Sequence, residues 1–576
     1  MAVIKMDWQK NLLIAAILAT LLMLVIRWHE YQENLPTPGA VATQTSTQMS
    51  NSSANPDSVP DAANADIPVV AGASAETEKN TQTSNSTQVI KVKTDSLDLS
   101  INPVGGDIVQ LALPRHYLKL NTPDQPFVLL DNRNHHTYLA QSGLIGPNGT
   151  DVKSRPVYAS EQQEYSLADG QNQLQVDLVL QQGEVKITKR FTFTRGEYLI
   201  NVEYLIDNQS SNSWTGRIYG QIKRDSQNFV KVSALEMNPY LGAAITTPDE
   251  KYKKITFADM REKYDEAPVA NKREFSSFNF TNAGGWIAMV QHYFVSAWIP
   301  DANSTNSYYL HKAGDEDLYL MGFIGKSTEV APGTQGVISA SFYAGPKDTE
   351  RLEQISPYLD LTVDYGWLWW VAKPLFAVLK WIHSLVGNWG LAIIGLTLIV
   401  KALFFKLSAT SYKSMAKMRK LAPKMAEMKE RYGDDRQKFS QEMMKLYKTE
   451  KVNPFGGCLP LLIQMPVFLA LYYVLMESVE LRHSPFFGWI LDLSVKDPYF
   501  VLPVIYGATM FLMQKLNPQP TDPMQARIMT MLPFVFTFMF LWFPAGLVLY
   551  WVTNNTLSII QQYIITKQIE AEPASK

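Results

Sequence analysis

The amino-acid sequence predicts a polytopic α-helical membrane protein with a large all-β domain outside the bilayer. Nearly all long apolar runs lie beyond residue 365, with one more at the N-terminus, whereas apolar residues alternate with polar ones over residues 88–346. The chain has 576 residues, 46% apolar and 18% charged, enough for several domains. Its one cysteine, Cys458, excludes an internal disulfide framework and a multi-cysteine metal site.

The first apolar run, residues 11–26, predicts an uncleaved membrane anchor over residues 1–28. Two lysines precede this run, and the sequence RWHEYQEN follows it where a signal peptide would have its small-residue cleavage site. Residues 29–87 are mostly Ser, Thr, Asn, Gln, Ala and Pro, with few large apolar side chains. Such a segment buries too little surface to offset the entropy of ordering, so we expect a flexible external tether.

Residues 88–346 carry the period-two pattern of half-buried antiparallel strands. Residues 174–180 and 200–206 alternate apolar and polar side chains, and glycine-rich pairs between such runs supply turns. The pattern predicts one large β-sandwich over residues 88–346.

The last third of the chain holds a Trp-rich amphipathic segment, suited to the membrane interface, and then five apolar stretches near spanning length. Residues 408–452 contain 12 Lys/Arg and 6 Asp/Glu, whereas residues 477–498 contain 2 and 4. The positive-inside rule therefore places the first loop and both termini in the cytoplasm and the β domain outside. The expected segments are 347–386 (connector and interfacial helix), 387–407 (span 2), 408–453 (basic cytoplasmic hairpin), 454–477 (span 3), 478–498 (external loop), 499–515 (span 4), 516–528 (cytoplasmic loop), 529–543 (span 5), 545–566 (span 6) and 567–576 (cytoplasmic tail).

Lys401 is a charge within the apolar stretch 389–405. A charged residue at the centre of a span costs about 3 kcal/mol on insertion scales, so such residues usually mark a polar cavity or a substrate path. The alternative is a lysine whose long stem reaches back to the headgroups. Its expected depth, about 7–8 Å from the cytoplasmic end of its helix, permits both.

Polar residues at comparable depth favour the cavity. Thr397 and Ser408 fall on the same helical face as Lys401. An amide on one of the other spans could instead serve only an interhelical hydrogen bond. Because the polar residues of these spans all lie toward the cytoplasmic side, however, they predict a shared wet cavity. These residues are Gln464, Asn554, Asn555, Ser558, Gln561 and Gln562.

Residues 412–450 predict a basic helical hairpin, with methionines at helical spacing between its arms and YGDD as the turn. Pro423 should kink or interrupt the first arm. We expect the excess of positive charge to attract anionic lipid or ribosomal RNA.

No motif of enzymatic chemistry occurs in the chain. We find no Walker loop, no H-E-x-x-H and no G-x-S-x-G, and the eight histidines are scattered. The sequence therefore predicts a protein that is not an enzyme, with no metal site and no cofactor.

From Trp381 onward the sequence closely resembles the YidC/Oxa/Alb family of membrane protein insertases, in its Gram-negative layout. The stretches WIHSLVGNWG, KVNPFGGCLPLLIQMPVFLALYYVLM, TDPMQARIMT and LWFPAGLVLYW carry the resemblance. It implies a five-helix insertase core, six spans in the bacterial inner (plasma) membrane, and a periplasmic β-supersandwich similar to sugar mutarotases. It also implies an insertase and chaperone for nascent inner-membrane proteins. The implied partners are the Sec translocon, the ribosome, the signal-recognition-particle receptor and membrane lipids, and no DNA.

The resemblance further implies a hydrophilic groove in the inner leaflet, open to cytoplasm and lipid and closed toward the periplasm. The groove of the family carries one basic residue, usually arginine, and Lys401 occupies that position. An ammonium lacks the planar fork of a guanidinium, so bidentate pairing is lost while attraction for acidic segments remains.

Other site residues follow from the same resemblance. The implied groove lining is Thr397, Gln464, Asn555 and Ser558, with Trp551 as an aromatic client contact. The implied apolar slide for a client helix, on spans 3 and 5, is Met465, Phe468, Pro533 and Phe536. The implied surface for ribosomes and targeting factors is Lys417, Arg419, Lys420, Lys424, Lys429 and Arg431.

Two other functions stay open from the sequence. A secondary transporter or channel for a small solute could use the same cavity, but it would need a polar path continuous to the outside, and polar residues thin out toward the external halves of the spans. Alternatively, the β domain could be a membrane-tethered periplasmic protein that binds or converts sugars.

Overall fold

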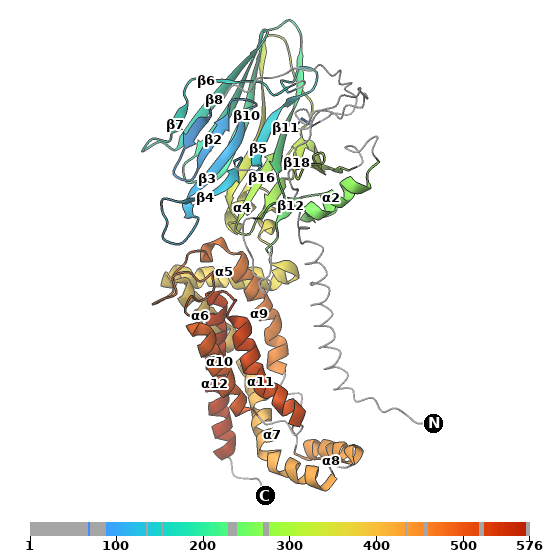
Figure 1. The fold of residues 1–576 in the computed structure, drawn as a ribbon, viewed down its shortest axis with the longest axis vertical. Coiled ribbons are helices and arrows are strands. Elements are labelled where there is room, and N and C mark those ends of the chain that lie inside the picture. The colour runs from blue at the N-terminus through green and yellow to red at the C-terminus, as the bar shows by residue number, and fades with distance from the viewer. Residues whose placement is uncertain are drawn as a thin grey trace, which may run out of the picture. The chain divides into compact units, whose positions relative to one another are not determined.

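The computed structural model describes residues 67–68, 88–133, 136–151, 154–228, 239–268, 276–432, 435–450, 452, 459–517 and 523–571. They belong to one compact unit, Asp61–Lys576, and form a β domain followed by a group of helices (Figure 1). The expected anchor, residues 1–28, and all but two residues of the expected tether lie outside the described residues.

Two sheets build the β domain, which confirms the expected β-sandwich. The 11-stranded sheet has the order β14-β17-β18-β11-β5-β4-β3-β2-β1-β7 with β19 paired to β11, and the 9-stranded sheet has the order β13-β12-β15-β16-β20-β10-β9-β8-β6. The strands of the first sheet are β1 (Ile90–Lys93), β2 (Asp98–Asn102), β3 (Asp107–Tyr117), β4 (Pro126–Asp131), β5 (Tyr138–Ile145), β7 (Glu164–Ser166), β11 (Trp214–Arg224), β14 (Phe278–Ala283), β17 (Thr305–Lys312), β18 (Tyr319–Ile324) and β19 (Thr328–Val330). Those of the second are β6 (Ala159–Ser160), β8 (Gln173–Gln182), β9 (Val185–Thr194), β10 (Leu199–Asn208), β12 (Gly242–Ile245), β13 (Lys253–Ile255), β15 (Ile287–Val290), β16 (Phe294–Pro300) and β20 (Thr334–Pro346).

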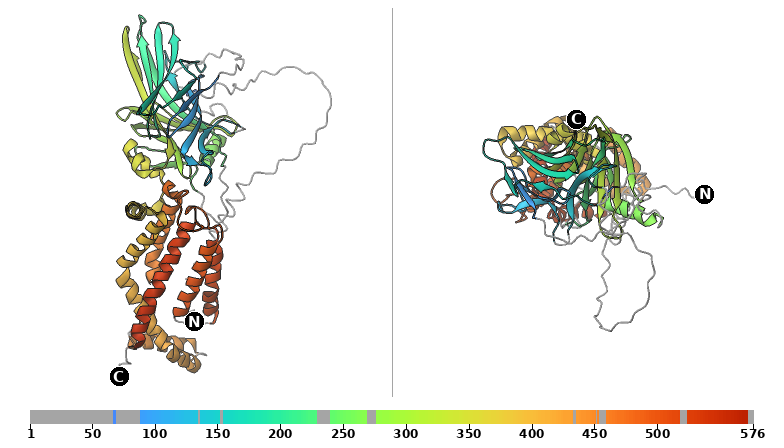
Figure 2. Two further views of the ribbon diagram at one scale, coloured as in Figure 1. Left: turned by 90° about the vertical axis from the view of Figure 1, so that its left-hand side faces the viewer. Right: turned by 90° about the horizontal axis from the view of Figure 1, so that it is seen from above.

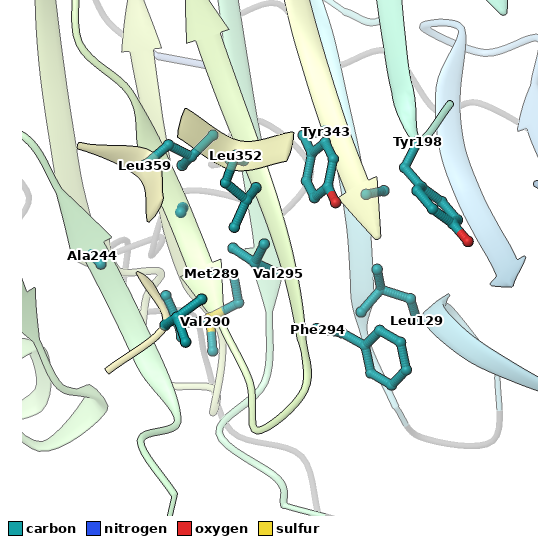
Figure 3. Close-up of a cluster of buried hydrophobic side chains, with 14 of the residues drawn as sticks. Leu129, Tyr198, Ala244, Met289, Val290, Phe294, Val295, Tyr343, Leu352 and Leu359 are labelled. Carbon is teal, nitrogen blue, oxygen red and sulfur yellow. The ribbon is translucent and has the colours of Figure 1, made fainter. Parts of the chain in front are cut away.

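The alternation in the sequence places one face of each strand in the core. Strand β10 shows this directly, because Ile200, Val202, Tyr204 and Ile206 are buried while their neighbours in the strand are less so. Helix α2 (Phe257–Glu266) adds a buried face of its own. Figure 3 shows Leu352, from helix α4 (Thr349–Ile355), among buried side chains of β15 and β16.

A lysine lies fully buried inside this β-sandwich. The Nζ atom of Lys189, on β9, donates to three backbone carbonyls. These belong to Gly105 (2.9 Å), Gly106 (2.8 Å) and Ser142 (3.1 Å). Burial lowers the pKa of Lys189 to about 7, opposed by the neighbouring Asp107 carboxylate, which pairs with Arg155. The ammonium is thus enclosed by acceptors, as a buried charge requires.

The helical part begins with a turn that the sequence encodes locally. Gly387, with φ 66°, closes helix α5 (Trp369–Val386) in the left-handed conformation that glycine adopts without strain. Asn388 then caps helix α6 (Trp389–Leu403), because its side chain accepts a hydrogen bond from the Leu391 N–H at 3.0 Å. The remaining helices are α7 (Phe405–Tyr432), α8 (Arg436–Thr449), α9 (Leu459–Glu477), α10 (Val501–Leu516), α11 (Pro523–Phe540) and α12 (Ala545–Ala571).

Helices α6, α9, α10, α11 and α12 run side by side, and α7 and α8 lie toward the end where α12 finishes (Figure 1; Figure 2). Among the described residues, no single helix is both long and apolar enough to be recognised as a membrane span by itself, whereas α6 and α7, bent by 69° where they meet, reach that length and composition together.

Several helix limits differ from those expected. Helix α7 continues through Pro423, so this proline does not interrupt the first arm of the hairpin. Helix α11 already begins at Pro523, inside the loop expected over residues 516–528, and α12 extends to Ala571. Proline is tolerated at the first turn of a helix because its missing N–H would have no partner there, which explains the early start of α11.

Replacing the buried lysine should destabilise the β domain. Lys189→Met leaves three carbonyls and the Asp107 carboxylate without the ammonium, and we expect a loss of about 3 kcal/mol in the free energy of unfolding. Pulse proteolysis of the full-length protein in urea would measure it. Lys186→Met, at an exposed position of the same strand, is the matched control. Equal stability of the two variants would contradict the role of Lys189.

The same burial predicts a pH dependence. The pKa of Lys189 falls from its ordinary value of 10.5 to about 7 in the folded domain, so the unfolded chain binds more protons between these pH values. The free energy of unfolding of the β domain should therefore rise from pH 7 toward pH 10. The Lys189→Met variant should show less of this rise in the same urea experiment, and identical slopes for both proteins would refute the assignment.

Candidate functional site

Lys401 lies in the last turn of α6 and points to α12. Its Nζ atom donates a hydrogen bond to the Ser558 Oγ atom at 2.6 Å. A cation in the last turn of a helix is favoured by the helix dipole. Within the described part of the chain, no carboxylate forms an ion pair with this ammonium, and the Lys401 side chain is half-buried.

The hydrogen bonding continues from α12 to α9. The Ser558 hydroxyl donates to the carbonyl oxygen of Asn554 at 2.8 Å, and the Gln464 side-chain amide donates to the Asn554 Oδ1 atom. Lys401, Ser558, Asn554 and Gln464 therefore form one polar cluster that joins α6, α9 and α12. We call these four residues the polar cluster.

Two other predicted groove residues do not hydrogen-bond to the polar cluster. The Thr397 hydroxyl donates to the Ile393 carbonyl of its own helix at 2.7 Å. Asn555 is buried and donates to the Thr509 hydroxyl of α10 at 3.3 Å. Gln562, like Asn555, forms its hydrogen bond toward α10. Its amide donates to Asn517, the residue that follows α10, at 2.9 Å.

Helix α12 thus has two polar faces rather than one. Trp551, Asn554 and Ser558 follow the i, i+3, i+7 spacing of one helical face, and Asn555 and Gln562 repeat after seven residues on another. The first face serves the polar cluster, and the second packs on α10.

Trp551 is the centre of an aromatic cluster on the first face. Its ring lies 4.8 Å from that of Phe468 on α9 and 6.1 Å from those of Tyr506 on α10 and Phe540 on α11. It lies one to two turns from Asn554 and Ser558, about 5–10 Å nearer the start of α12. The indole N–H is buried and has no hydrogen-bond partner among the residues that the structure describes. The polar cluster therefore ends against a layer of aromatic rings.

The four residues expected to form the slide differ in exposure. Met465 is 48% exposed, Phe468 and Phe536 are half-buried, and Pro533 is buried. Thr537, one turn after Pro533, lies on the side of α11 that packs on α10. Its hydroxyl is so close to Gly507 of α10 that a Cβ atom on this glycine would lie 2.2 Å from it. The exposed apolar side of α11 is formed by Met531, Phe534, Val535 and Phe538.

The six basic residues of the expected ribosome surface are all exposed on α7. Lys420 donates to the carbonyl oxygen of Ile569 on α12, and Lys424 pairs with Glu450 at 2.9 Å. Met425 and Leu421 face the other arm and pack near Val452. The methionines thus hold the arms together while the basic residues stay at the surface.

Known proteins match almost the whole chain. Residues 89–378 match the family described as the YidC periplasmic domain, and residues 381–572 match the family described as the 60Kd inner membrane protein. A protein of Cellvibrio japonicus (strain Ueda107) named membrane protein insertase YidC is 68% identical over 566 residues, which cover 98% of this chain and 99% of that protein. A protein of the same name from Saccharophagus degradans is 52% identical over 571 residues, which cover 98% and 100%.

Two solved structures are also similar. One, described as an active YidC insertase with the first transmembrane domain resolved, has a TM-score of 0.36 and 18% identity over 83% of this chain and 93% of that chain. The other, a galactose mutarotase-like protein from Lactobacillus casei ATCC 334, has a TM-score of 0.28 and 9% identity over 44% and 99%.

Proposed function

The chain belongs to the YidC family of membrane protein insertases, and from this premise we propose that it inserts nascent inner-membrane proteins through the polar cluster around Lys401. Family matches over residues 89–378 and 381–572, and a relative 68% identical along nearly the whole chain, support the insertase function. The protein is an inner-membrane insertase with a periplasmic β-sandwich domain. Its action needs binding and partitioning only, with no covalent step.

The observation that carries this proposal is the state of the Lys401 ammonium. It is hydrogen-bonded to a neutral hydroxyl, and no carboxylate of the described residues forms an ion pair with it. A charge that is held in place without being neutralised attracts negative groups strongly where the dielectric constant is low. The acidic tail of a client therefore enters the groove near Lys401 before it crosses.

The aromatic cluster around Trp551 supports an insertase over a channel. A channel for a small polar solute needs polar groups along its whole length, whereas the polar cluster here gives way to the rings of Phe468, Tyr506 and Phe540. A polar tail has only this short apolar layer to pass. The apolar helix of the client then leaves sideways along α9 and α11, driven by its transfer into lipid.

The topology and partners extend the same proposal. Six spans with both termini in the cytoplasm place the β domain in the periplasm and the α7–α8 hairpin in the cytoplasm. The exposed basic residues of α7 suit the ribosome and the signal-recognition-particle receptor, because both offer extended surfaces for electrostatic attraction. Helping clients to fold, and cooperation with the Sec translocon, belong to the same activity.

Removing the charge tests the proposal. Lys401→Ala should slow the insertion of a small client with an acidic tail about tenfold, the effect of losing one charge-assisted hydrogen bond. Lys401→Arg should insert this client normally. Protease protection of the tail in membrane vesicles measures the rate, and Lys406→Ala, an exposed lysine at the start of α7, is the control. Normal insertion by the alanine variant would mean that Lys401 only reaches for the headgroups.

The exit path has its own test. A photocrosslinker at Met465 or Phe536 should capture a stalled nascent membrane protein, because the proposed path runs along α9 and α11. The control position is Leu512, which is as exposed as Met465 but lies on α10. Equal capture from all three positions would show general exposure to the client and contradict a path along these helices.

A further inference from the structure

The hydroxyl of Ser558 joins α6 to its own helix, α12. It accepts a hydrogen bond from the Lys401 ammonium at 2.6 Å and donates to the Asn554 carbonyl of α12 at 2.8 Å. Ser558 and the nearby Tyr412 of α7 are both buried. A hydroxyl has one proton and two lone pairs, so it can make both of these hydrogen bonds at once.

The contact lies at the bend between α6 and α7. Lys401 precedes the 69° bend by half a turn, and Tyr412 follows it by two turns. Tyr412 is fixed there by packing on Ile565 and Ile569 of α12. α12 therefore meets both sides of the bend, through Ser558 before it and through Ile565 and Ile569 after it, which holds Ser558 beside Lys401.

We propose that Ser558 is a positioning residue for insertion, whose hydroxyl holds the Lys401 ammonium inside the groove. This inference rests on the proposed function of Lys401. The lysine stem has four rotatable bonds, and a free ammonium near a membrane surface turns toward water and headgroups. A buried hydroxyl at hydrogen-bond distance opposes this movement and keeps the charge at the depth where the client tail passes.

The chemistry of a hydroxyl suits this role better than that of a carboxylate. Aspartate at this position would hold the lysine more strongly, but it would also neutralise the charge that attracts the client. Serine occupies one of the three ammonium protons and carries no charge, so two protons remain for a carboxylate or carbonyl of the client. The arrangement therefore fixes the position of the charge without reducing it.

Serine and threonine hydroxyls in helices often donate only to the carbonyl one turn earlier. Thr556 of α12 does so with the Val552 carbonyl at 2.7 Å, and its side chain is exposed. Thr556 thus makes the same kind of backbone hydrogen bond as Ser558, but its side chain is exposed. This makes Thr556 the matched control.

The experiment compares Ser558→Ala, Ser558→Thr and Thr556→Ala in the full-length protein in membrane vesicles. Two clients are used that differ only in whether the translocated tail carries acidic residues or their amides. We expect Ser558→Ala to slow the acidic client about fivefold more than the neutral client, because only the acidic tail uses the positioned charge. Ser558→Thr restores the hydroxyl and the wild-type difference between clients, and Thr556→Ala does not alter it.

An equal effect of Ser558→Ala on both clients would overturn the inference, since it would indicate packing alone. So would identical behaviour of Ser558→Ala and Thr556→Ala. Lys401→Ala in the same assay separates this inference from the proposed function. If Lys401→Ala abolishes the difference between clients and Ser558→Ala does not, only the positioning role fails; if Lys401→Ala leaves the difference intact, both fail.

Discussion

The helical part is organised by the need to hold an ammonium among apolar helices. A charge removed from water is costly unless a polar group meets it, and for Lys401 that group is the hydroxyl of Ser558. This contact requires that α12 turn the face that carries Ser558 toward the last turn of α6. Once that face is set, helical geometry directs Asn554 to Gln464 on α9 and Trp551 to Phe468 one turn further on.

The second polar face of α12 follows from the same rotation. With Ser558 turned to α6, Asn555 and Gln562 must point elsewhere, and they meet Thr509 and Asn517 at α10. Interhelical hydrogen bonds of this kind stabilise helix pairs in an apolar environment, where leaving an amide unpaired is the alternative. One face of α12 therefore serves the polar cluster and the other serves the packing on α10.

The sequence alone was sufficient to predict the β-sandwich and to single out Lys401 as a candidate, because alternation and a charge in an apolar run are both local signals. It was not sufficient to choose between Asn554 and Asn555. These neighbours have the same side chain at nearly the same depth, and only the rotation of α12 against α6 separates them. The burial of Pro533 could not be predicted for a similar reason. The side of α11 that meets α10 is determined by the close approach at Gly507. Tyr412, beyond the bend, could not be identified from the sequence, because its packing on Ile565 and Ile569 depends on how α7 turns back toward α12.

Lys189 and Lys401 show how surroundings separate structure from function. Lys189 donates to three carbonyls beside Asp107, so its ammonium has no proton left for another molecule. Lys401 donates to one hydroxyl and has no carboxylate partner among the described residues. The first arrangement uses the protons of the ammonium within the domain. The second leaves ammonium protons unused among the described residues, which is the arrangement that the proposed attraction of a negatively charged client segment requires.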